Sequence, residues 1–287
     1  MPNSLQGKTI LVTGATNGIG LITARELAKM GAQVTIVGRN AEKCAAVAEH
    51  IQAAAGTPVE VIVGDLSVME GVRQVAITFR EKHSQLHVLV NNAGGMFTRR
   101  VLTADGFEYT FALNHLNYFL LTDLLLDLLK AGAPSRIINV SSVAHENAKI
   151  DFDNLQGQKR FVGLEAYGQS KLANLLFTYE LARRLEGTGV TANALHPGVV
   201  ATGFARNNGP IYNVGTWIAG QLFFRKPERG AQTSIYLASS PDVEGVSGKY
   251  FVDCKAVASR PQSYDRAAAE RLWQVSLEMT EKARQNN

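Results

Sequence analysis

The sequence predicts an α/β protein in which a doubly wound, parallel sheet of seven strands is flanked by helices within a single domain. Short runs rich in Val and Ile alternate with longer segments of helical periodicity, which is the pattern of repeated βαβ units. The runs lack polar alternation, as expected of strands buried on both faces. No composition shift, Ser/Gly-rich linker or internal repeat divides the 287 residues.

Seven short apolar runs are assigned as strands because each is bounded by turn residues and followed by a helical pattern. In chain order they are Lys8–Thr13, Gln33–Gly38, Val59–Val63, Leu86–Val90, Arg136–Val140, Val190–Leu195 and Lys249–Phe251.

The helices are assigned from apolar periodicity and from residues that start or stop a helix. They are Gly18–Met30, Ala41–Ala55, Ser67–Lys82, Ala104–Lys130, Glu165–Glu186, Pro227–Ala238 and a C-terminal helix over Ser263–Arg284. Asn40 and Ser67 are expected to be N-caps, while Gly31, Gly56 and Gly187 stand where helices should end.

Composition excludes several classes of protein. With 46% hydrophobic and 19% charged residues, the chain is not globally disordered. Its net charge of +4 comes without a dense Lys/Arg block, so nucleic-acid binding is not expected. Cys44 and Cys254 are far apart and match no disulfide framework or metal spacing, which is typical of a reducing compartment.

Two further features predict a cytoplasmic protein without a transmembrane segment. Met1–Gly7 is short and polar, unlike a signal peptide. A long uncharged run, Asn207–Phe224, contains a proline and three glycines, so it is unlike a membrane-spanning helix of about 20 apolar residues. We expect residues 199–226 to form an apolar lid over a substrate site instead.

Glycines follow the first predicted strand in the segment Thr13-Gly14-Ala15-Thr16-Asn17-Gly18-Ile19-Gly20, which opens directly into a helix. Glycine lets the backbone turn sharply and approach a pyrophosphate, and a helix N-terminus offers free N–H groups to an anion. Taken alone, the same turn is also compatible with tight packing of a helix on a strand.

The second strand ends at Gly38-Arg39, where a sheet that binds NAD usually has an acidic residue for the adenosine ribose. Arg39 can instead clamp a 2′-phosphate, which favours NADP over NAD. An exposed arginine at a strand end is the alternative. Asp65 and Leu66 follow the third strand and Asn92-Ala93-Gly94 the fourth, where they would line an adenine slot or serve as ordinary turn residues.

Tyr167 and Lys171 are four positions apart in a predicted helix and therefore share one face. The lysine ammonium can then favour the tyrosine phenolate, with a cationic nicotinamide ring as a second contributor. Ser142 follows the fifth strand at the same sheet edge, where its hydroxyl can hold a substrate oxygen. Asn114 lies inside a helical pattern and either binds a water that relays protons to Lys171 or is a buried, backbone-bonded amide.

In this order, the motifs from Lys8 to Phe251 resemble the short-chain dehydrogenase/reductase superfamily. The resemblance implies a Rossmann sheet that binds NADP(H) and a catalytic set of Asn114, Ser142, Tyr167 and Lys171. It also implies contacts to the coenzyme from the following residues: Gly14, Thr16, Asn17, Gly18, Ile19, Gly20, Arg39, Asp65, Leu66, Asn92, Ala93, Gly94, Tyr167, Lys171, Pro197, Gly198, Val200 and Thr202.

A narrower resemblance is to the retinol dehydrogenase branch. It rests on Thr103–Glu108, Val140–His145, Ser170–Asn174, Gly248–Phe251 and the 25 positions between Ser142 and Tyr167. It implies NADP(H)-dependent interconversion of a lipophilic alcohol and its aldehyde or ketone. Apolar side chains in the substrate-side loops fit such a substrate: Met96, Phe97, Phe152, Phe161, Phe204, Tyr212, Trp217, Phe223 and Phe224.

Two alternatives stay open: a light-dependent double-bond reductase of the protochlorophyllide type, and a non-catalytic sensor of NADP(H). The expected partner is a lipophilic carbonyl or alcohol, and a homo-oligomer is compatible with the sequence. No metal is expected, because His83 and His87 are read as the exit from a helix without an acidic partner on the same pattern.

Overall fold

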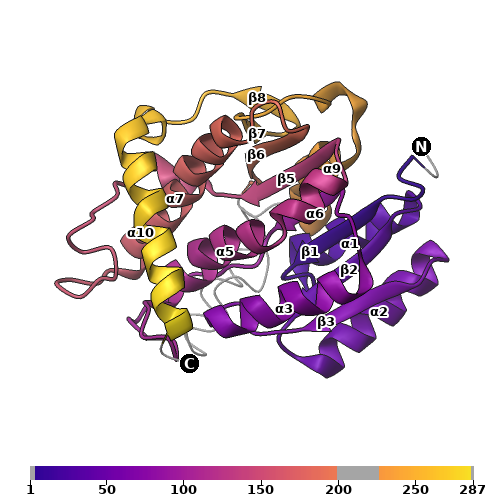
Figure 1. The fold of residues 1–287 in the computed structure, drawn as a ribbon, viewed down its shortest axis with the longest axis horizontal. Coiled ribbons are helices and arrows are strands. Elements are labelled where there is room, and N and C mark those ends of the chain that lie inside the picture. The colour runs from indigo at the N-terminus through magenta and orange to yellow at the C-terminus, as the bar shows by residue number, and fades with distance from the viewer. Residues whose placement is uncertain (1–3, 199–225, 286–287) are drawn as a thin grey trace.

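The computed structural model describes residues 4–198 and 226–285. One eight-stranded sheet crosses these residues in the order β3-β2-β1-β4-β5-β6-β7-β8 (Figure 1). The strands are β1 (Thr9–Thr13), β2 (Gln33–Gly38), β3 (Val59–Val63), β4 (Val88–Asn91), β5 (Ser135–Val140), β6 (Val190–His196), β7 (Tyr250–Val252) and β8 (Lys255–Val257).

The prediction of seven parallel strands is correct for β1 to β7 and wrong for the whole sheet. Strand β8 pairs antiparallel with β7, from Tyr250 opposite Val257 to Val252 opposite Lys255. The two residues between them, Asp253 and Cys254, both have positive φ (48° and 62°), as a two-residue hairpin turn requires. The turn contains no glycine, so the sequence carries no strong hairpin signal there.

Helices cover both faces of the sheet. They are α1 (Gly18–Lys29), α2 (Ala41–Ala55), α3 (Met69–Lys82), α4 (Tyr109–Phe111), α5 (Asn117–Leu124), α6 (Leu126–Ala131), α7 (Gly163–Arg184), α9 (Pro227–Ser239) and α10 (Arg266–Gln285). One core cluster joins the sheet to α1, α2 and α9, and the other joins it to α3, α5, α7 and α10. No helix within 4–198 or 226–285 is long and apolar enough to span a membrane.

The helix expected over Ala104–Lys130 is wrong as a single element. It begins only at Tyr109, contains a π-helical turn at Ala112–Leu116, and is interrupted at Leu125 between α5 and α6. The late start has a clear cause, because both carboxylate oxygens of Glu108 accept backbone N–H groups of α4, from Thr110 and Phe111 at 2.8 Å each.

The expected N-cap at Asn40 is confirmed, since its side chain accepts the Lys43 N–H at 2.8 Å. The one at Ser67 is wrong. Ser67 instead donates both its N–H and its hydroxyl to Asp65 Oδ1, at 2.9 and 2.7 Å. The N–H of Met69, at the start of α3, is accepted by the distant Asp105 at 2.8 Å. The C-terminal helix begins at Arg266 because Pro261–Tyr264 form a 3₁₀ turn.

The parallel register brings the segments that follow β1 to β6 to one edge of the sheet. Strand β1 pairs with β2 on one side and with β4 on the other. Successive strands are therefore added in one direction from β1 to β3 and in the opposite direction from β4 onward, so the strand order reverses between β1 and β4. Ligands of doubly wound sheets bind in the crevice at such a reversal, beyond the carboxyl ends of the strands.

Candidate functional site

The turn between β1 and α1 is packed so tightly against the segment after β4 that Gly14 and Gly20 have no room for a Cβ. A Cβ on Gly14, which has φ of +64°, would lie 2.7 Å from Ala93 Cα. A Cβ on Gly20 would lie 2.5 Å from both Asn92 Nδ2 and Gly14 O. Asn17 stands before α1 without capping it through its side chain, and Gly18 has φ of +54°. This is a turn that brings bare backbone and a helix N-terminus to the sheet edge, which fits a pyrophosphate.

Asn92 and Ala93 fix that turn through hydrogen bonds. The backbone N–H groups of both donate to Thr13 Oγ1, at 2.9 and 3.0 Å. Asn92 Nδ2 donates to the carbonyls of Thr13 and Gly14, at 2.8 and 3.2 Å. The amide of Asn92 therefore holds two loops together, a role that its position after a strand does not reveal.

Arg39 lies exposed at the end of β2, and its Nη1 donates to the Tyr109 hydroxyl at 3.1 Å. A Cβ on the preceding Gly38 would lie 2.5 Å from Thr16 Cγ2, so the end of β2 is pressed against the β1–α1 turn. Asp65 is exposed after β3, where its carboxylate is engaged by Ser67, and Leu66 is buried. The residues expected at the adenosine end thus share the same sheet edge as the glycine turn.

Tyr167 and Ser142 meet across the boundary between α7 and the end of β5. Tyr167 is buried, and burial raises the pKa of its phenol above the ordinary value, while a side-chain hydrogen bond with Ser142 acts in the opposite direction. The Ser142 hydroxyl also accepts the Ala144 N–H at 3.2 Å, which fixes the start of the following 3₁₀ turn at Val143–Asn147.

Lys171 is 3% exposed, and its Nζ donates to the Val140 carbonyl at 2.9 Å. Burial lowers the pKa of this ammonium to about 7. The Nζ lies 5.7 Å from the centroid of the Tyr167 ring. A Cβ on Gly94 would lie 3.5 Å from the same Nζ and 2.8 Å from Asn114 Oδ1. The segment after β4 therefore packs closely against Lys171 and Asn114.

Asn114 lies in the π-helical turn with its side chain fully buried. Its Oδ1 accepts the Gly95 N–H at 2.8 Å, and its Nδ2 donates to the Gly95 carbonyl at 3.0 Å and to Ser170 Oγ at 2.9 Å. The side chain is a buried amide that holds the backbone of Gly95. It binds α7 to the segment after β4 just where Gly94 meets Lys171.

Sequence reasoning missed Tyr109 and Tyr118. Tyr118 is fully buried, its ring centroid lies 5.7 Å from Lys171 Nζ, and its hydroxyl has no hydrogen-bond partner among the described residues. Lys171 Nζ is thus equally distant from the Tyr118 and Tyr167 rings. The sequence contained a signal for Tyr118, because it lies four positions after Asn114, the spacing of two residues on one face of an α-helix. The π-helical turn at Ala112–Leu116 breaks that periodicity, so the spacing alone does not place both residues on one face.

The segment after β6 contributes Pro197 and Gly198, the latter with φ of +84°. His196 Nδ1 accepts the Val143 N–H at 3.2 Å, which ties this segment to the residue after Ser142. Val200 and Thr202 lie outside the described residues, as do the expected lid and five of its side chains: Phe204, Tyr212, Trp217, Phe223 and Phe224.

Among the described substrate-side aromatics, Phe97 packs edge-on against Tyr109 with ring centroids 4.6 Å apart. Phe152 packs under the guanidinium of Arg271, 4.1 Å from its ring centroid, and Phe161 covers Gly157. Phe152 and Phe161 therefore have packing roles of their own. His83 Nε2 lies 3.2 Å from Oε2 of Glu60, which belongs to β3 and not to the same sequence pattern, and His87 Nδ1 accepts the Thr9 N–H.

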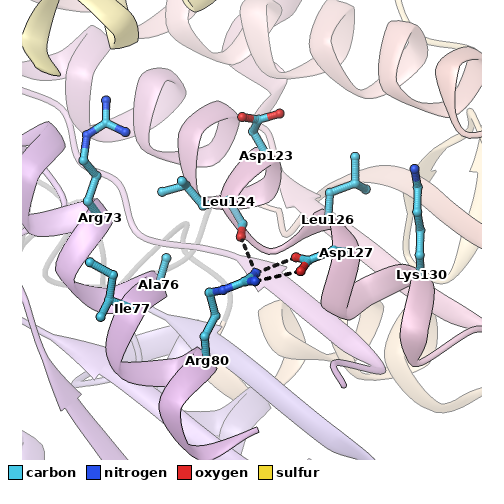
Figure 2. A pocket seen from close by; sticks show the side chains of 9 residues that line it. All are labelled: Arg73, Ala76, Ile77, Arg80, Asp123, Leu124, Leu126, Asp127 and Lys130. Carbon is cyan, nitrogen blue, oxygen red and sulfur yellow. Dashed lines mark hydrogen bonds and ion pairs between the residues drawn. The ribbon is translucent and has the colours of Figure 1, made fainter. Parts of the chain in front are cut away.

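A pocket lies away from this edge, between α3 and the α5–α6 region (Figure 2). Arg80 spans it, donating to the two carboxylate oxygens of Asp127 at 2.5 and 2.7 Å and to the Leu124 carbonyl at 3.1 Å. The lining residues are Arg73, Ala76, Ile77, Arg80, Asp123, Leu124, Leu126, Asp127 and Lys130. None of them is a predicted site residue, so this pocket is separate from the strand-end site.

Comparison with known proteins places these features in a family. The family described as short chain dehydrogenase matches residues 8–212. Retinol dehydrogenase 12 of Mus musculus is 48% identical over 276 residues, which cover 96% of this chain and 87% of that protein. Retinol dehydrogenase 14 of Homo sapiens is 44% identical over 295 residues, with coverage of 96% and 87%.

Solved structures of other proteins are also similar to this chain. The Pseudomonas aeruginosa RhlG/NADP active-site complex is 30% identical with a TM-score of 0.72, covering 88% of this chain and 96% of that one. A short chain dehydrogenase of Burkholderia cenocepacia, in complex with NADP, is 29% identical with a TM-score of 0.68, covering 87% and 97%.

Proposed function

Because the chain belongs to the short-chain dehydrogenase family and is similar to retinol dehydrogenases, we propose that it is an NADP(H)-dependent oxidoreductase that interconverts a lipophilic alcohol and its aldehyde or ketone. The observation that carries the proposal is the meeting of Ser142, Tyr167 and Lys171 at the carboxyl edge of the sheet, beside the glycine turn. A substrate carbonyl held there would lie within reach of a phenol and a serine hydroxyl.

The bound coenzyme would supply or accept a hydride, and this chain's residues would handle the proton. Tyr167 donates its phenolic proton to the substrate oxygen in reduction and takes it back in oxidation. Ser142 holds that oxygen through a hydrogen bond and already bonds to the phenol. Lys171, once charged, favours the phenolate, and its position at Val140 keeps the ammonium in place.

The end of β2 supports the proposal that the coenzyme is NADP(H). An exposed guanidinium after a strand at the adenosine end suits a 2′-phosphate and has nothing acidic beside it in the Gly38-Arg39-Asn40 segment. Two structural relatives are complexes with NADP, which supports the same choice. The substrate class is supported by the similarity to retinol dehydrogenases.

The first test is Tyr167→Phe. The variant should lose at least about 99% of turnover with NADPH and a lipophilic aldehyde, because general acid–base catalysis contributes roughly 10²- to 10⁴-fold. NADPH binding, measured by the fluorescence of the bound coenzyme, should stay near that of the wild type. Near-normal turnover in a variant that still binds NADPH would refute the role of Tyr167, and binding without turnover of the wild type over retinoids, alkyl aldehydes and cyclic ketones would favour the sensor.

The second test is Arg39→Asp. Replacing the guanidinium by a carboxylate should weaken NADPH binding by about tenfold or more, because a charge-assisted bond to phosphate is lost and a repulsion is added. NADH binding should be preserved or improved. Unchanged dissociation constants for both coenzymes would show that Arg39 does not bind the 2′-phosphate.

A further inference from the structure

Arg39 is bound by a side chain from a distant part of the chain. Its Nη1 donates to the hydroxyl of Tyr109 at 3.1 Å, and the two residues are 70 positions apart. We infer that Tyr109 is a positioning residue that holds the Arg39 guanidinium ready for the 2′-phosphate and so contributes to the preference for NADP(H). The inference rests on the proposed function, because it assumes that Arg39 binds that phosphate.

Tyr109 is suited to hold the exposed Arg39 side chain because it is itself fixed at three points. Its backbone N–H donates to the Val101 carbonyl at 2.9 Å. The buried Glu108 caps α4, in which Tyr109 is the first residue, through both carboxylate oxygens. The ring packs edge-on against Phe97, with centroids 4.6 Å apart at an interplanar angle of 68°.

Arg39, in contrast to Tyr109, combines a fixed backbone with an exposed side chain. Its backbone is fixed, because β2 pairs with β1 up to Val37 and with β3 up to Gly38. A Cβ on Gly38 would also lie only 2.5 Å from Thr16 Cγ2 and 2.7 Å from Cys44 Sγ. Its side chain is exposed and has many rotamers. A hydrogen bond from one of its five N–H donors limits those rotamers and leaves the other donors for a phosphate.

Holding a side chain in its bound conformation improves affinity by reducing the ordering cost paid on binding. The benefit falls only on a coenzyme that uses the guanidinium. Loss of the Tyr109 hydroxyl should therefore weaken binding of NADPH and leave NADH almost untouched, a difference that general damage to the fold would not produce.

The experiment measures dissociation constants of NADPH and NADH for the full chain by coenzyme fluorescence. It also measures 2′,5′-ADP and 5′-AMP by calorimetry, so that the readout does not depend on turnover. Tyr109→Phe keeps the ring on Phe97 and removes only the hydroxyl. We expect it to weaken NADPH and 2′,5′-ADP binding by roughly three- to tenfold, with NADH and 5′-AMP within about twofold of the wild type.

Tyr236→Phe is the matched control, because it removes a phenolic hydroxyl on α9, where the ring packs near Phe251 of β7. It should leave all four constants unchanged. In an Arg39→Ala background, Tyr109→Phe should have no further effect on NADPH, since the two residues act through one contact.

The outcomes separate the two claims. If Arg39→Ala weakens NADPH but Tyr109→Phe does not, or if Tyr109→Phe weakens both coenzymes equally, the positioning role of Tyr109 is wrong while the NADP assignment stands. If Arg39→Ala leaves NADPH binding unchanged, the coenzyme assignment fails, and the inference about Tyr109 fails with it.

Discussion

Lys171 is 3% exposed, and burial lowers the pKa of its ammonium to about 7, while burial raises that of the neighbouring Tyr167 phenol. Both shifts oppose the charged forms that catalysis needs, because a low-dielectric site penalises an isolated ion of either sign. Without a further positive charge, Lys171 does not by itself lower the pKa of the Tyr167 phenol towards neutral pH. A cationic nicotinamide ring in the site, as oxidised NADP would provide, would be a second positive charge that favours the Tyr167 phenolate, beside Lys171.

The same burial makes a prediction about stability. The folded-state pKa of Lys171, about 7, lies below the value of about 10.4 expected in the unfolded chain. Between these values the unfolded chain binds more protons, so this residue makes the free energy of unfolding rise with pH, by up to about 1.4 kcal/mol per unit. Urea unfolding of the wild type and Lys171→Met at about pH 7.5, 8.5 and 9.5 checks it. The free energy of unfolding of the wild type should increase relative to that of the variant as pH rises. A constant difference between the two free energies would mean that Lys171 stays charged in the folded protein.

Among the elements, the close approach of α7 to the end of β5 sets the geometry of the site. A Cβ on Gly168, between Tyr167 and Lys171, would lie 2.9 Å from the Ala144 carbonyl and 3.3 Å from Ala148 Cβ. Gly168→Ala should therefore push α7 away from the 3₁₀ turn that begins after Ser142. We expect kcat to fall by roughly tenfold or more, because a displacement of about 1 Å at a site can cost about a hundredfold, while NADPH binding is kept.

A control for that variant is Gly187→Ala, where φ is +77° and a Cβ meets nothing within 4 Å. It should cost about 1 kcal/mol of stability through backbone strain alone and leave kcat unchanged. Equal losses of kcat in both variants would mean that activity follows stability and not the spacing of α7 from the turn.

The elements also show what a single sequence can predict. Strands β2 and β3 and helix α2 have the bounds expected of them, because their apolar runs and flanking turn residues are local signals. The start of α4 depends on both oxygens of Glu108, and the start of α3 on Asp105, 36 positions away. Tyr109 escaped notice for the same reason, since its contact with Arg39 exists only once the sheet has formed.

Across the whole molecule, α10 returns over the helical layer that contains the site. It runs beside α7 and α5 in Figure 1 and packs on α7, α5 and α3. Trp273 contacts Phe119 and Phe177, with ring centroids 5.0 and 5.8 Å apart. Ser276 Oγ lies 2.9 Å from Nε2 of the buried His115, whose pKa burial lowers to about 4, so this imidazole is neutral at physiological pH.

Because these contacts join α10 to α3, α5 and α7, which share one core cluster with the sheet, α10 should unfold with the rest of the molecule. Arg73 of α3 donates to the Thr280 carbonyl at 2.7 Å, and Leu272, 1% exposed, belongs to the core shared with α3, α5 and α7. Leu272→Ala should lower the free energy of unfolding by about 2–5 kcal/mol, since it leaves a cavity in that core. Gln274→Ala, at an exposed position of the same helix, should change it by less than about 0.5 kcal/mol.

Urea unfolding followed by circular dichroism and by fluorescence tests this cooperativity. In a single cooperative unit, Leu272→Ala moves one transition to lower urea without changing its slope, and the two probes coincide. If α10 were a separate appendage, the variant would show an early, partial loss of helix while the main transition stayed in place. That result would also mean that the site, whose Asn114 adjoins His115 under α10, does not depend on the C-terminal helix for its stability.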